Sequence, residues 1–208
     1  MTAASPRHDL IVFGATSFVG KILTRHLLEQ FGACGDLKWA AAGRSLARLE
    51  ELRASLGPEA AKLPLVVADA ADEAALRQMC ARTRAVVSTV GPYALYGEPL
   101  VRVCAETGTD YCDLTGEAQW IRRMLSQYEE MARKSGARIV HCCGFDSIPS
   151  DLGVHFLQQA AIRRFGQPCP RVKMRVKALR GGVSGGTVAS ILNIVKEAAA
   201  DPQLRKEL

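Results

Sequence analysis

The chain has 208 residues, which is enough for one complete domain and part of a second, and 48% of its residues are hydrophobic. This composition is ordinary for a globular protein and excludes the disordered and fibrous classes. The formal net charge of +6 favours anionic ligands such as phosphates, but the charges are scattered and form no basic stripe interleaved with aromatic residues, so we expect no nucleic-acid partner.

Short apolar runs alternate with amphipathic stretches through the first 148 residues. We expect strands at residues 10–13, 37–42, 65–68, 85–90, 111–114 and 138–142, and helices at residues 18–31, 46–56, 73–80, 98–107 and 117–134. Apolar strands separated by helices are typical of βαβ units, in which helices cover both faces of a parallel sheet. Residues 1–148 therefore predict an α/β fold of the Rossmann type, with a doubly wound parallel sheet of about six strands.

The pattern changes in residues 149–208. We expect a helix at 150–165, a breaker cluster at 166–170, a Gly-rich turn at 181–186 and a last helix from 187. Residues 172–179 alternate apolar and basic side chains, which predicts a half-buried antiparallel strand. Because a lone strand cannot form a stable sheet, we expect this region to be the start of an α+β substrate or dimerisation domain, either incomplete or completed by a second copy in a homodimer.

The first candidate site is the turn between the first strand and the first helix, which reads Gly-Ala-Thr-Ser-Phe-Val-Gly. Its first glycine permits the tight turn, its last lets the helix pack on the strand, and the amides between them face a pyrophosphate at the helix N-terminus. The expected cofactor contacts here are Gly14, Thr16, Ser17, Phe18, Val19 and Gly20. Ser17 replaces the third glycine of many such loops, and its hydroxyl could bond a phosphate oxygen. A sharp turn without a ligand is the alternative.

The end of the second strand distinguishes NADP from NAD. An acidic residue there would bond the ribose 2′-hydroxyl of NAD and would repel a 2′-phosphate. This strand instead leads into Arg44 and Ser45, with no carboxylate. Arg44 offers a permanently charged fork that suits a phosphate, whereas Ser45 either adds a hydroxyl or caps the next helix. We therefore expect NADP as the cofactor, and NAD only as a weaker ligand.

Two further strand ends complete the expected cofactor site. Asp69 and Ala70 follow the third strand, where Asp69 could bond the adenine amino group or cap the next helix. Val90, Gly91 and Tyr93 follow the fourth strand at the carboxyl edge of the sheet, where the nicotinamide must lie. Either a close pass of the backbone over the cofactor or a tight loop alone explains the glycine.

A nicotinamide enzyme also needs a group that protonates the reduced substrate. Tyr93 and Asp146 are the leading candidates, because both follow strands on the ligand edge. Each could instead have a purely structural role, since tyrosines pack loops and aspartates tie turns. The same two readings apply to the other polar residues of this edge, which are Tyr96, Asp113, Glu117 and Ser147.

The seven cysteines are an odd number spread along the chain, and no signal-like segment precedes them. They indicate reduced thiols and a cytoplasmic protein, and contact with the periphery of a membrane stays open. Their spacing matches no zinc site and the four histidines do not cluster with them, so we expect no metal. Cys142 and Cys143 are better explained as small apolar residues at the end of a strand than as a thiol nucleophile. No apolar run reaches the roughly 18 residues of a membrane span.

With these residues in place, the chain resembles the saccharopine dehydrogenase-like oxidoreductases, including their trans-acting enoyl reductase branch. The resemblance rests on residues 14–20, 42–45, 90–93, 111–117, 143–153 and 184–187. The most particular stretches are Tyr-Cys-Asp-Leu-Thr-Gly-Glu at 111–117 and Cys-Gly-Phe-Asp-Ser-Ile-Pro-Ser-Asp-Leu-Gly at 143–153. The resemblance implies an NAD(P)-dependent oxidoreductase with a larger mixed-sheet substrate domain, of which this chain looks like the front half.

We therefore expect an NADP-dependent oxidoreductase that reduces an enoyl or imine substrate, either a small molecule or a lipid-like intermediate. The stretch at 143–153 favours the enoyl branch. The alternative is a catalytically silent NADP-binding module that acts as a sensor or scaffold, which the missing substrate domain favours. An epimerase-type enzyme would carry a Tyr-x-x-x-Lys pair, but Leu100 stands four residues after Tyr96.

Overall fold

The computed structural model of the chain describes residues 8–178, 180–182 and 184–207. Its centre is a parallel sheet with the strand order β3-β2-β1-β4-β5-β6. The strands are β1 (His8–Phe13), β2 (Trp39–Gly43), β3 (Leu65–Val67), β4 (Thr83–Ser88), β5 (Asp110–Asp113) and β6 (Ile139–Val140). The expected doubly wound Rossmann sheet is confirmed. Its strand order reverses between β1 and β4, and such a switch point places a ligand crevice at the carboxyl ends of these two strands.

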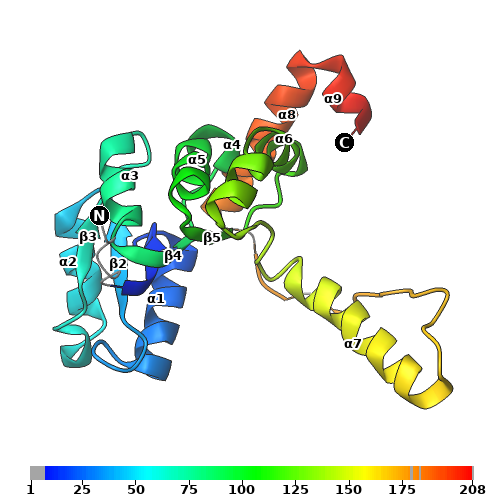
Figure 1. Ribbon diagram of the computed structural model, residues 1–208, viewed down its shortest axis with the longest axis horizontal. Coiled ribbons are helices and arrows are strands. Elements are labelled where there is room, and N and C mark those ends of the chain that lie inside the picture. The colour runs from blue at the N-terminus through cyan, green and yellow to red at the C-terminus, as the bar shows by residue number, and fades with distance from the viewer. Residues whose placement is uncertain (1–7, 179, 183, 208) are drawn as a thin grey trace.

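Helices cover both faces of this sheet (Figure 1). They are α1 (Phe18–Phe31), α2 (Leu46–Ser55), α3 (Glu73–Cys80), α4 (Tyr93–Tyr96), α5 (Glu98–Thr107) and α6 (Ala118–Ser135), with a 3-10 turn, η1 (Pro58–Ala60). The alternation of side chains along β1 explains the two layers. Ile11 and Phe13 are buried in one core cluster with α3, α5 and α6, whereas Val12 is buried in the other with α1 and α2.

The region after the sheet departs from its expected structure. The expected strand at 172–179 is wrong for residues 172–178, which have no regular secondary structure, and Leu179 lies outside the described residues. The alternating pattern needs a neighbouring strand that pairs with its backbone and covers its apolar side chains. No described strand pairs with it, and Met174 and Val176 are 64% and 71% exposed.

The helices of this region are α7 (Ile148–Phe165), α8 (Gly185–Ala200) and α9 (Pro202–Glu207). The last expected helix is divided in two because Pro202, which cannot continue a helix, follows Asp201. α7 extends away from the sheet and exposes large apolar side chains such as Phe156 and Phe165 (Figure 1). A helix with so much exposed apolar surface needs a further partner to cover it. Across the described residues, no helix combines the length and apolar character needed to cross a membrane.

Candidate functional site

The turn between β1 and α1 requires glycine at both of its ends. Gly14 has a φ of +86°, and a Cβ atom there would lie 2.7 Å from Thr89 Oγ1 and from Val90 Cγ2. A Cβ atom on Gly20 would lie 2.1 Å from the carbonyl oxygen of Gly14. The two glycines therefore allow the turn to fold tightly on itself and against the end of β4, as in a dinucleotide-binding loop.

The amides of this turn divide into two groups. Those of Gly14, Ala15 and Ser17 donate to backbone carbonyls, and that of Gly20 donates to the Ser17 hydroxyl. Those of Thr16, Phe18 and Val19 donate to no described residue. Unpaired amides at the beginning of a 14-residue helix, at the strand-order switch, form a natural site for an anion.

The Ser17 hydroxyl braces the turn. Ser17 Oγ accepts from the Gly20 amide at 2.9 Å and lies 2.9 Å from Thr89 Oγ1. Thr89 Oγ1 donates its one proton to the Gly14 carbonyl oxygen at 2.9 Å, so the Ser17 proton goes to Thr89. The expected bond from Ser17 to a phosphate stays a prediction, but this geometry favours a bracing role. The sequence pattern does not single out Thr89, although it is a buried polar residue directly after an apolar strand.

The Arg44 side chain is available to bind a ligand. It follows β2, its side chain is exposed, and it forms no ion pair or hydrogen bond with the residues that the structure describes. Ser45 caps α2, where its hydroxyl accepts from the Arg48 amide at 3.4 Å. A guanidinium without a protein partner beside the crevice suits the 2′-phosphate that the sequence predicts.

The end of β3 is organised differently from the expected cap. The Asp69 carboxylate accepts from the Ala71 amide at 2.9 Å, and Asp72, rather than Asp69, caps α3. Asp69 is exposed and Ala70 packs against the core at the same strand end. The expected contacts of both residues with an adenine remain predictions.

The residues after β4 differ in what they leave free for a ligand. Gly91 is exposed and Val90 packs against the core beside Gly14. Tyr93 is buried, and its hydroxyl donates to the Ser88 carbonyl oxygen at 3.0 Å and accepts from the Leu114 amide at 3.4 Å. Burial raises the pKa of the Tyr93 hydroxyl well above its usual value, with a further contribution from the Asp113 carboxylate. The role of Tyr93 as proton donor stays a prediction, and its contacts favour a positioning role.

Asp146 has the opposite character. It is exposed at the carboxyl edge of the sheet, after β6, and its carboxylate makes no hydrogen bond with the described residues. A Cβ atom on Gly116 would lie 3.5 Å from Asp146 Oδ2, so the strand ends of β5 and β6 meet here. Asp146 therefore remains a candidate proton donor with an unoccupied carboxylate.

A buried hydrogen-bond cluster fastens β5 to β6. Asp113 Oδ2 lies 2.7 Å from His141 Nδ1 and accepts from the Tyr111 hydroxyl at 2.9 Å, and Asp113 Oδ1 accepts from the amides of Thr115 and Cys142. Burial, and next the Asp113 charge, raise the pKa of the Tyr111 hydroxyl. Both carboxylate oxygens are thus occupied, and Asp113 holds the strand ends together.

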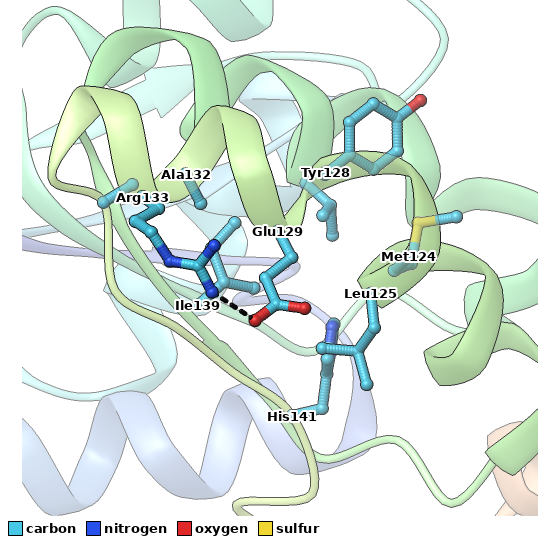
Figure 2. Close-up of a pocket in the computed structure, with 10 residues that line it drawn as sticks. Met124, Leu125, Tyr128, Glu129, Ala132, Arg133, Ile139 and His141 are labelled. Atoms are coloured by element: carbon cyan, nitrogen blue, oxygen red, sulfur yellow. Dashed lines mark hydrogen bonds and ion pairs between the residues drawn. The ribbon is translucent and has the colours of Figure 1, made fainter.

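His141 also lines a pocket of about 290 Å³ between α6 and β6 (Figure 2). Apolar side chains of α6 form much of its wall, and the Glu129–Arg133 ion pair spans its rim. His141 Nε2 is buried without a hydrogen-bond partner among the described residues. Among all residues that the structure describes, no group of three or more His, Cys, Asp or Glu side chains is placed to hold a metal ion.

Comparison with known proteins identifies the domain that this geometry builds. The profile of the saccharopine dehydrogenase NADP-binding domain family matches residues 10–140, which is more than half of the chain and contains the glycine turn and the whole sheet core. The chain belongs to this family. NADP is therefore its cofactor, as Arg44 and the absence of a carboxylate after β2 predict.

Several mycobacterial proteins are similar to the whole chain. One from Mycobacterium tuberculosis, named as a candidate trans-acting enoyl reductase, is 45% identical over 208 residues, which are 100% of this chain and 49% of that protein. A trans-acting enoyl reductase of Mycobacterium bovis BCG is 42% identical over 207 residues, which are 99% of this chain and 49% of that protein. The chain thus spans about half the length of the curated relatives that it matches.

A solved structure has the same fold. It is the apo saccharopine dehydrogenase (L-Glu forming) from Saccharomyces cerevisiae, with a TM-score of 0.58 and 21% sequence identity over 76% of this chain and 32% of that chain. At this identity the likeness concerns the fold alone, and it agrees with the predicted Rossmann sheet.

Replacing Thr89 by valine tests the brace of the glycine turn. The change keeps the branched side chain but removes one of the two donors to the Gly14 carbonyl and the acceptor of the Ser17 hydroxyl, so we expect a loss of about 1–2 kcal/mol in the free energy of unfolding and a weaker NADPH complex. Thr83→Val is the matched control, because Thr83 is buried at the other end of the same strand and donates to the Ala85 carbonyl. If both variants bind NADPH equally well in calorimetric titrations, Thr89 does not shape the cofactor loop.

Proposed function

We propose that this chain is the cofactor-binding half of an NADP-dependent reductase that acts on the carbon–carbon double bond of an enoyl substrate. The observation that carries the proposal is the group of unpaired amides at Thr16, Phe18 and Val19, open to a pyrophosphate at the strand-order switch. The names of the similar mycobacterial proteins support an enoyl substrate over an imine. They also favour a reductase over the alternative of a catalytically silent sensor or scaffold.

The residues of the crevice would share the work of binding NADP. The glycine turn and the α1 amides would hold the pyrophosphate, and Arg44 would pair with the 2′-phosphate. Asp69 and Ala70 would border the adenine, and Val90 and Gly91 would border the nicotinamide. When bound, NADPH supplies the hydride; the protein orients the ring and provides a proton.

Asp146 is the side chain best placed for that proton among the two candidates. Its carboxylate is exposed and unpaired on the ligand edge, whereas both hydrogen-bonding positions of the Tyr93 hydroxyl are filled. In a complete protein, residues from the remaining half would cover this edge and exclude water from it. In this proposal residues 1–148 form the cofactor domain and residues 149–208 begin the substrate domain.

Three finer features belong to the same proposal. The substrate is a small or lipid-like acyl compound, since the exposed apolar faces of α7 and α8 need apolar partners. A second copy of the chain could cover part of these faces in a homodimer. Because the cysteines form no disulfide among the described residues, we place the protein in the reducing cytoplasm. Contact with the surface of a membrane belongs to the same proposal.

The test is NADPH oxidation by the complete polypeptide that carries this sequence. We expect NADPH to be consumed with an enoyl thioester and much more slowly with an imine, and NADH to replace NADPH poorly. Asp146→Asn should lower turnover at least tenfold while leaving the NADPH dissociation constant nearly unchanged. Tight NADPH binding without oxidation by any enoyl thioester would contradict the reductase and support the silent module.

A further inference from the structure

Glu117 carries a buried charge that the proposed chemistry does not use. It lies directly before α6, its side chain is 1% exposed, and no described lysine or arginine pairs with it. Three donors satisfy its carboxylate instead. Oε1 accepts from the Tyr93 amide and from the Ser190 hydroxyl, both at 2.8 Å, and Oε2 accepts from the Ala94 amide at 2.9 Å. A buried carboxylate persists only where such donors replace its hydration.

The three donors come from two distant parts of the chain. Tyr93 and Ala94 begin α4, immediately after the residues that border the nicotinamide side of the crevice. Ser190 belongs to α8, beyond α7, in the region that begins the substrate domain. α8 lies against α4 and α6 (Figure 1). One carboxylate therefore joins the substrate-domain side of the molecule to the loop that borders the cofactor.

A second attachment of α8 avoids this loop. Glu197 accepts from Gln119 Nε2 at 3.2 Å and lies 3.8 Å from Arg123, and both of these partners are on α6. The two attachments are about two helical turns apart on α8. Only the Ser190 attachment contacts the carboxylate that holds the amides after β4, so the two can be separated by substitution.

We infer that Glu117 is a positioning residue that couples the seating of α8 to the shape of the loop at residues 90–94. The inference rests on the proposed function, because it gives that loop its place beside the nicotinamide. When α8 is seated, the Ser190 hydroxyl adds a third donor and the carboxylate stays fixed over the amides of Tyr93 and Ala94. When α8 moves away, Oε1 loses one donor, water enters, and the loop loosens at the edge where the hydride must be transferred.

The first test measures the loop itself and needs neither cofactor nor substrate. In the complete polypeptide, Ser190→Ala should speed hydrogen exchange of the Tyr93 and Ala94 amides on the order of tenfold, because a charge-assisted hydrogen bond to their acceptor is lost. Ser190→Thr keeps a hydroxyl and should restore slow exchange. Glu197→Gln is the matched control: it removes the ion pair with Arg123 but keeps an acceptor for Gln119, so α8 stays seated with the Ser190–Glu117 bond intact and exchange at these two amides should match the wild type.

The second test separates positioning from simple stability. With NADPH and an enoyl thioester, Ser190→Ala should lower kcat about tenfold and change the NADPH dissociation constant less than twofold, because the phosphates bind elsewhere. Glu197→Gln should leave kcat unchanged. Unchanged amide exchange in Ser190→Ala, or equal effects of both substitutions on exchange, would overturn the inference. Wild-type protein without NADPH oxidation would overturn the proposed function instead, while the exchange result would still stand.

Glu117→Gln gives a stronger version of the same change. Its amide oxygen can accept from the backbone, but its NH₂ group would face a second backbone amide, which also donates. We expect faster exchange at Tyr93 and Ala94 than in Ser190→Ala. If Glu117→Gln does not fold, Ser190→Ala alone decides the question, because Ser190 is only partly buried.

Discussion

Replacing Gly20 by alanine should abolish NADPH binding and lower the free energy of unfolding by about 3 kcal/mol. The added Cβ atom would lie 2.1 Å from the Gly14 carbonyl oxygen and 2.8 Å from the Ala15 Cα atom. Both neighbours are backbone atoms, so no side chain can turn aside to make room. The turn must open, and the amides of Thr16, Phe18 and Val19 then no longer converge on one anion.

Gly153→Ala is the matched control for this change. Gly153 lies inside α7 with no atom within 4 Å of its added Cβ, so alanine there should be neutral or stabilise the helix by up to about 1 kcal/mol. Urea denaturation and calorimetric titration with NADPH give both quantities for each variant. A Gly20→Ala protein that keeps wild-type stability and NADPH affinity would contradict the geometry of the turn.

Replacing Arg44 by alanine should weaken NADPH binding by about 2 kcal/mol, which is about thirtyfold in the dissociation constant. The reason is the loss of a charge-assisted bond to the 2′-phosphate, which NADH lacks. The affinity for NADH should therefore change less than twofold. Because the guanidinium is exposed and forms no bond with the described residues, the free energy of unfolding should stay within about 0.5 kcal/mol of the wild type.

Arg48→Ala provides the control for general charge. Arg48 is exposed in α2, one turn beyond Arg44, and its removal changes the net charge by the same amount. We expect it to weaken NADPH binding far less than Arg44→Ala does. Equal losses of NADPH and NADH affinity in Arg44→Ala would show that Arg44 does not bind the 2′-phosphate.

Much of the Rossmann half could be predicted because its signals are local. The bounds of α1, α3 and α5 follow from capping residues such as Ser17 and Asp72 and from the glycines at positions 32 and 108, which end helices with a positive φ. The strand order follows from the alternation of strands and helices, which leaves few topologies for a parallel sheet.

The remainder depends on contacts between distant residues. Glu117 and Ser190 are 73 positions apart, and no local pattern indicates that the carboxylate of one accepts from the hydroxyl of the other. The same holds for Thr89, whose hydroxyl bonds the turn 75 positions earlier. The prediction of a strand at 172–178 is wrong for the same reason. An alternating pattern of apolar and polar residues produces a strand only where a distant partner strand pairs with it, and the pattern itself does not show whether that partner is present.

The most direct measurement is a calorimetric titration of the wild-type chain with NADPH and, separately, with NADH under the same conditions. If the unpaired amides of the turn hold a pyrophosphate and Arg44 pairs with the 2′-phosphate, NADPH should bind at least tenfold more tightly than NADH. Equal affinities, or no binding of either nucleotide by the folded chain, would contradict this assignment.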